Sequence, residues 1–99
     1  MRARRVDFAP EAVADLAAIA DWVAEVAGIA AASSYLDRLE DFCLRLDIAS
    51  GRGQARDDIR PGLRVVGFER KLTIAFVVEE ECVTILRIHA GGRNWDDLP

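Results

Sequence analysis

The last third of the chain alternates between short apolar runs and polar breaks. Three runs rich in β-branched and aromatic residues lie at Leu63–Phe68, Leu72–Val78 and 83–89. The breaks between them, residues 69–71 and 79–82, are too short for a crossover, so consecutive runs must return antiparallel. This pattern predicts a three-stranded antiparallel meander.

The middle run of the meander is apolar on both faces, because successive side chains of a strand point to opposite sides. One face holds Leu72, Ile74, Phe76 and Val78, and the other holds Thr73, Ala75 and Val77. A strand of this kind is usually covered on both sides. We expect helices on one face, and either the chain's own tail or a partner on the other.

The first half of the chain predicts an edge strand followed by a helix. Residues 4–8 form a short extended run that we expect to join the sheet as an edge strand. Pro10 and Glu11 are favourable in the first turn of a helix. Apolar residues then recur at helical spacing from Val13 onwards. Gly28 is a typical C-terminal cap, so we expect this helix to end there.

A second helix is predicted over residues 29–48, again from helical spacing of its apolar side chains. The single glycine between the helices predicts an antiparallel helical hairpin. Residues 52–61 are expected to form a polar loop, and residues 90–99 a loose tail. The element order is β-α-α-β-β-β. It predicts one α+β domain over residues 1–99 in two layers, with the hairpin packed on one face of a mainly antiparallel sheet.

Composition and charge narrow the functional classes. With 99 residues and 52% hydrophobic residues the chain is a single small folded domain. The apolar surplus indicates a surface that a partner covers, unless alanine inflates the count. The net charge of −4 argues against a general nucleic-acid-binding surface. No signal peptide or membrane-spanning run is evident, so we expect a cytoplasmic protein.

The sequence offers few groups for catalysis or metal binding. Cys43 and Cys82 form no metal-ligand spacing, and we expect both to be free thiols. His89 is the one histidine, and nothing in the sequence places it beside a nucleophile. No phosphate-binding loop is present. We therefore predict no catalytic residues, no metal and no cofactor.

Arginines are the remaining candidates for chemistry. A local basic zone lies within residues 52–71, which contain six basic and three acidic residues. Arg64, Arg87 and Arg93 come together if the outer strands of the meander place them at the same face of the sheet. Clustered guanidinium groups bind phosphate or carboxylate. The alternative is that each arginine pairs with an acid of the domain.

Several stretches resemble the RelE/ParE superfamily of bacterial toxins, and its ParE branch most closely. The resemblance covers nearly the whole chain. It rests on Asp7-Phe8-Ala9-Pro10-Glu11-Ala12 with Asp15-Leu16, on Gly53 followed by Asp57-Asp58-Ile59-Arg60-Pro61-Gly62-Leu63-Arg64, and on Ile74-Ala75-Phe76 with residues 83–93.

The resemblance implies a toxin of a type II toxin–antitoxin module that poisons DNA gyrase. It further implies a ParD-type antitoxin, which wraps the toxin and itself binds operator DNA, so we expect no direct DNA binding by this chain. For target or partner binding we select the basic and tail residues Arg64, Arg87, His89, Arg93 and Trp95. For antitoxin binding we select the apolar residues Trp22, Val26, Tyr35 and Phe42. Ordinary core packing is the alternative role of Trp22.

Two other functions stay open. The RelE branch cleaves messenger RNA on the ribosome, using basic residues and commonly a C-terminal tyrosine. Here the one tyrosine, Tyr35, lies on the second predicted helix, and His89 is the sole ordinary base. We therefore favour inhibition by binding over RNA cleavage. The third possibility is an interaction domain without toxicity.

Overall fold

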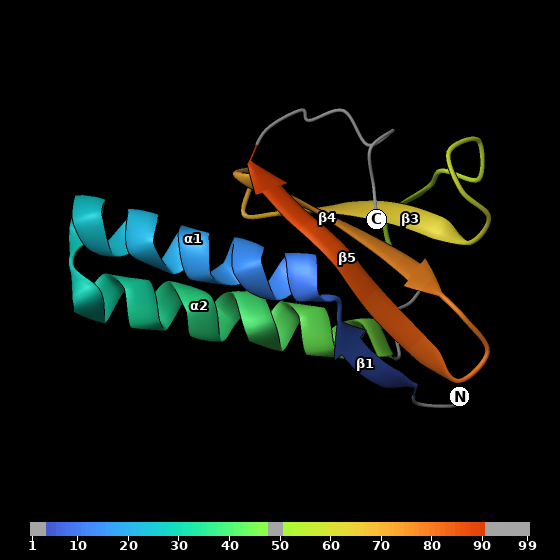
Figure 1. The fold of residues 1–99 in the computed structure, drawn as a ribbon, viewed down its shortest axis with the longest axis horizontal. Helices are drawn as coiled ribbons and strands as arrows, with labels where there is room; N and C mark the ends of the chain where they lie inside the picture. Colours follow the sequence, from blue (N-terminus) through green and yellow to red (C-terminus); the bar gives the residue numbers. More distant parts are fainter. Residues whose placement is uncertain (1–3, 48–50, 91–99) are drawn as a thin grey trace.

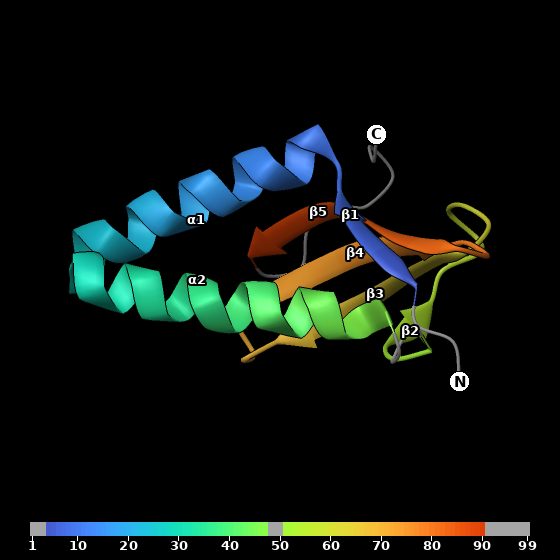
Figure 2. The same ribbon diagram turned by 90° about the horizontal axis from the view of Figure 1, so that it is seen from below.

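The structure is a computed structural model that describes residues 4–47 and 51–90. Two helices cover one face of a five-stranded sheet (Figures 1 and 2). This arrangement confirms the predicted two-layer α+β fold. In chain order the elements are β1 (Arg5–Phe8), α1 (Pro10–Ala27), α2 (Ile29–Leu44), the 3₁₀ turn η1 (Arg45–Asp47), β2 (Gln54–Ala55), β3 (Leu63–Phe68), β4 (Leu72–Val78) and β5 (Cys82–Ala90).

The strand order in the sheet is β1-β5-β4-β3-β2. Strands β3, β4 and β5 form the predicted antiparallel meander, and β1 joins it at one edge, parallel to β5. At the other edge, β2 pairs with β3 through Gln54 and Ala55. This two-residue strand lies in the segment predicted to be a loop. Both of its residues are exposed, so no hydrophobic alternation marked it in the sequence.

The core has two parts, one on each face of the sheet. Between the helices and the sheet, Leu39 of α2, Phe76 of β4 and Ile85 of β5 are fully buried. Cys43 of α2 and Leu46 of η1 belong to the same cluster. On the other face, Leu63 and Ala75 are fully buried in a smaller cluster. The alternation predicted for β4 is therefore confirmed.

The end of α1 at Gly28 and the end of α2 at Leu44 define the length of the helical hairpin. Gly28 ends α1 with φ 98°, a conformation that other residues rarely adopt, and its N–H donates to the Ala24 carbonyl. The second helix was predicted to run to residue 48. Its α-helical part ends at Leu44, and the 3₁₀ turn η1 follows, while residue 48 lies outside the described residues.

The tip of the helical hairpin projects beyond the end of the sheet, as both ribbon views show (Figures 1 and 2). Side chains near the tip therefore have no strand beneath them. Trp22, Val26 and Ile29 are 57%, 67% and 82% exposed. Neither α1 nor α2 has the length and apolarity that a membrane crossing requires.

Candidate partner-binding site

Trp22 is the centre of an apolar surface between α1 and the end of the sheet. A hollow of about 490 Å³ is lined by Ala18, Ile19, Trp22, Lys71, Leu72 and Ala90. A second hollow, of about 220 Å³, is lined by Trp22, Val23, Val26, Ala27, Tyr35 and Lys71. We call these two hollows together the Trp22 surface. It joins the overhanging helices to the first residue of β4 and the last residue of β5.

The helical repeat explains why α1 presents this surface. Residues four apart lie one above the other on a helix, so Ala18, Trp22 and Val26 form one row. The neighbouring row, with Ile19 and Val23, packs against the main core. The apolar stripe of α1 is therefore wider than the sheet can cover, and its outer row stays exposed.

Three of the four predicted antitoxin-binding residues come together on this surface. Trp22 and Val26 are exposed on α1, which excludes ordinary core packing for Trp22. Tyr35 is only 9% exposed, but it lines the smaller hollow beside them. Phe42 lies elsewhere: its ring centroid is 5.2 Å from that of Phe68. Phe42 lines neither hollow, and the guanidinium carbon of Arg52 lies 5.4 Å from the centre of its ring.

Lys71 also lines both hollows, although it is not among the predicted binding residues. It closes the turn between β3 and β4, where Glu69 and Arg70 have φ angles of 48° and 60°. Arg38 binds the Glu69 carboxylate at 2.9 Å and lies 5.3 Å from the centre of the Tyr35 ring. The sequence places Lys71 in a polar break and in the basic zone of residues 52–71, but no pattern reveals which side of a turn faces a groove.

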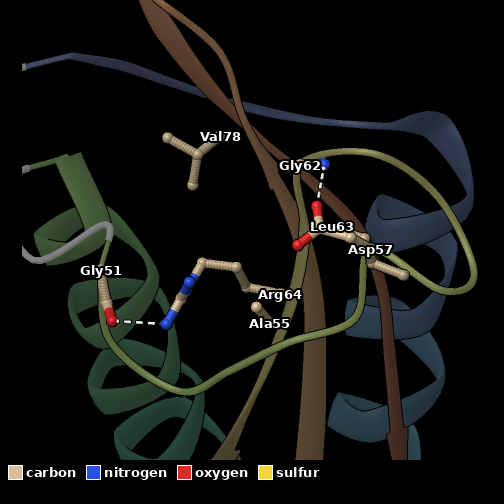
Figure 3. A pocket seen from close by; sticks show the side chains of 7 residues that line it. All are labelled: Gly51, Ala55, Asp57, Gly62, Leu63, Arg64 and Val78. Atoms are coloured by element: carbon tan, nitrogen blue, oxygen red, sulfur yellow. Dashed lines mark hydrogen bonds between the residues drawn. The ribbon is translucent and has the colours of Figure 1, made fainter.

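Arg64 is held by backbone carbonyl groups. Its Nη2 donates to the Gly51 carbonyl at 2.7 Å (Figure 3) and to the Gly53 carbonyl at 2.8 Å, and its Nε donates to the Arg52 carbonyl at 3.0 Å. In the same hollow, of about 240 Å³, the Asp57 carboxylate accepts the Gly62 N–H at 2.9 Å. Through these hydrogen bonds, Arg64 of β3 holds residues 51–53 close to the strand.

Arg87 is held by Asp15 of α1. Its Nε and Nη2 donate to the two carboxylate oxygens at 2.8 and 3.0 Å, and the Ile88 N–H donates to the same carboxylate at 2.9 Å. His89, which is buried, has its Nε2 4.0 Å from Asp15 Oδ2. Partial burial alone would raise the pKa of Asp15. The hydrogen bonds from Arg87 and Ile88, with the charge of Arg87, outweigh it and lower that pKa.

The predicted arginine cluster is therefore divided. Arg64 pairs with Phe76 and Arg87 with Ala75, neighbouring residues of β4 whose side chains point to opposite faces. Arg87 and His89 do come together, around Asp15. Arg93 and Trp95 lie outside the described residues.

Metal-ligand and thiol chemistry add little to the site. Across residues 4–47 and 51–90, no three His, Cys, Asp or Glu side chains gather as a metal site would require. Cys43 and Cys82 are free thiols, as predicted. Burial of Cys43, with the nearby charge of Glu40, raises the pKa of its thiol to about 12.

Comparison with known proteins identifies the family. The sequence model described as "ParE toxin of type II toxin-antitoxin system, parDE" matches residues 6–95. The chain therefore belongs to the ParE toxin family of type II toxin–antitoxin systems. A solved structure titled "Chromosomal ParDE TA system from P. aeruginosa" is similar, with a TM-score of 0.77 and 26% identity over 90% of this chain and 97% of that one. A comparison with curated protein sequences gave no match.

Proposed function

We propose that this protein inhibits DNA gyrase in the cytoplasm and that a ParD-type antitoxin neutralises it by covering the Trp22 surface. The observation that carries the proposal is the family match over residues 6–95, combined with an exposed apolar surface at the tip of the hairpin. Family membership supplies the class of activity. The surface supplies a place where an antitoxin can act.

The chemistry of the Trp22 surface supports an antitoxin contact. Large, partly exposed aromatic side chains flanked by hollows are typical anchors of protein interfaces. Trp22 is 57% exposed and borders both hollows, and Val26 and Tyr35 extend the apolar lining. A partner segment with apolar side chains gains affinity by filling these hollows, because it removes their lining from water.

The positions of the arginines support binding rather than RNA cleavage. A nuclease of the RelE type would need Arg64, Arg87 and His89 around one open site. Here Arg64 is occupied by three carbonyl groups, while Arg87 is paired with Asp15 beside a buried His89. These contacts favour a role of the arginines in stabilising the domain.

Growth on induction is the first test. We expect growth arrest when this chain is produced alone, and relief of the arrest when the product of the neighbouring small reading frame is produced with it. Unimpaired growth in both cases would support the non-toxic interaction domain instead.

The target requires a second experiment. Purified chain, added to gyrase and relaxed plasmid, should reduce ATP-dependent supercoiling, and equimolar antitoxin should restore it. Topoisomerase I relaxation serves as the control reaction. Unchanged supercoiling together with shortened transcripts after induction would replace gyrase inhibition by the RelE-type reaction.

A further inference from the structure

We infer that Lys71 selects the partner segment that covers the Trp22 surface by requiring a carboxylate placed between two apolar anchors. The inference rests on the proposed function, because it needs a partner at this surface. Beyond the proposed function, it specifies that the partner segment carries a carboxylate and that Lys71 binds this group.

Lys71 is the shared cation of two otherwise mainly apolar hollows. The larger one is lined, apart from Lys71, by Ala18, Ile19, Trp22, Leu72 and Ala90, and the smaller one by Trp22, Val23, Val26, Ala27 and Tyr35. Both sets are free of acidic side chains. An apolar anchor in each hollow would therefore flank the lysine from two sides.

The ammonium group of Lys71 remains available to a partner. Among the described residues, no salt bridge is formed by Lys71. Its neighbour Glu69 is engaged by Arg38, whose Nε and Nη2 donate to the two carboxylate oxygens at 2.9 and 3.3 Å. That pair, with a smaller contribution from Lys71, lowers the pKa of Glu69. The nearest carboxylate is thus already hydrogen-bonded elsewhere.

Covering the surface changes the energetics of this lysine. In the free protein the ammonium group keeps its water. A partner that fills both hollows displaces water around Lys71, and a desolvated ammonium group is costly unless an acceptor replaces that water. A carboxylate is the strongest acceptor available from a protein partner. We therefore expect an aspartate or glutamate in the partner within one helical turn, or two strand residues, of each apolar anchor.

A display selection tests this inference and does not require the antitoxin itself. Random 16-residue peptides are selected on the purified chain, on Lys71→Glu and on Trp22→Ala. We expect wild-type binders to carry an acidic residue between two large apolar ones. The Lys71→Glu selection should replace that acid by lysine or arginine. For a selected acidic peptide, Lys71→Glu should weaken binding at least about tenfold.

Matched variants separate charge from shape and from folding. Lys71→Met keeps the aliphatic stem and should weaken binding less than Lys71→Glu. Arg70→Glu makes the same charge change one residue away but lines neither hollow, so it should leave the dissociation constant nearly unchanged. Urea midpoints of all variants show whether each is folded.

The outcomes distinguish the inference from the proposed function. If Trp22→Ala abolishes peptide binding while Lys71→Glu selects the same motif as wild type, the role of Lys71 is overturned and the Trp22 surface stands. If binders emerge that are insensitive to both substitutions, or none emerge, the Trp22 surface itself is overturned, and the inference with it.

Discussion

Asp15 joins α1 to the open part of the β5 edge. Strand β1 pairs with β5 over residues 82–85, and beyond them no other strand of the described residues lies along this edge. The Asp15 carboxylate accepts the Ile88 N–H there and also binds Arg87. A side chain of the helix thus satisfies a strand donor that would otherwise face solvent, and it blocks that edge to other strands.

Replacing Asp15 should make stability less dependent on pH. Because the folded pKa of Asp15 is lowered, its contribution is complete above the unfolded carboxyl pKa of about 4 and is lost as pH falls through the folded pKa. Asp15→Asn should therefore cost about 2 kcal/mol at pH 7. Urea unfolding between pH 7 and 3 should show the gap to wild type narrowing at acid pH. A constant gap would contradict this assignment.

The two thiols should differ in reactivity. Cys43 is fully buried and its pKa is raised to about 12, whereas Cys82 is half-buried at the start of β5. At pH 8, Ellman's reagent should modify one thiol of the folded protein and the second only on unfolding. Cys82→Ser should remove the fast phase. A fast reaction that survives this substitution would show that Cys43 is accessible.

At the scale of elements, the loop between η1 and β3 depends on a close backbone approach. Gly53 has φ 82°, and a Cβ atom there would lie 2.3 Å from the Val65 carbonyl oxygen. The loop therefore lies against β3 only because this position lacks a side chain. The same close packing lets three loop carbonyls accept hydrogen bonds from Arg64.

Gly53→Ala should lower the free energy of unfolding by about 2 kcal/mol, through the left-handed backbone and the collision with β3. Gly51→Ala is the matched control, since a Cβ atom there meets nothing within 4 Å. Urea unfolding of the two variants provides the measurement. Equal losses would show that loop entropy, rather than contact with β3, determines the effect.

The overhang of the helical hairpin is the other element-scale feature with a measurable consequence. Trp22 is 57% exposed and packs little in the free protein. Trp22→Ala should change the free energy of unfolding by no more than about 1 kcal/mol. It should weaken antitoxin binding by about 2 kcal/mol or more, measured by calorimetry. Equal losses in folding and binding would show that Trp22→Ala weakens binding through lost stability and not through a lost contact.

At the scale of the whole molecule, the features predicted correctly from sequence are those with a local period. The meander follows from apolar runs separated by short breaks, and the hairpin follows from helical spacing and Gly28. The edge strand is predicted over residues 4–8 and is observed at Arg5–Phe8. Its parallel pairing with β5 was not specified, because hydrophobic spacing carries no information about which strand will be the neighbour.

Features that depend on long-range geometry cannot be predicted from local sequence patterns. Strand β2 forms because its backbone pairs with the edge of β3. Its two residues are both exposed, so they show no hydrophobic alternation. The pairing of Asp15 with Arg87 joins residues far apart in the chain, so it required the fold to be known. Lys71 was overlooked for the same reason: its position between two hollows arises only when α1 and the β3–β4 turn meet.

The pairing of β1 with β5 has a consequence for synthesis of the protein. Among the described residues, β1 pairs with β5 alone, and the Asp15 carboxylate accepts its backbone hydrogen bond from Ile88 of β5. In a chain that has grown to residue 81, β1 therefore has no strand to pair with and the Asp15 carboxylate lacks its hydrogen bond from Ile88. Strand β4 also lacks one of its two neighbours. The sheet therefore cannot be completed until β5 has been synthesised, and contacts between residues so far apart in sequence also slow folding. Ribosomes that stop early consequently release fragments without the completed sheet, so a premature stop codon anywhere before β5 should act as a loss-of-function allele.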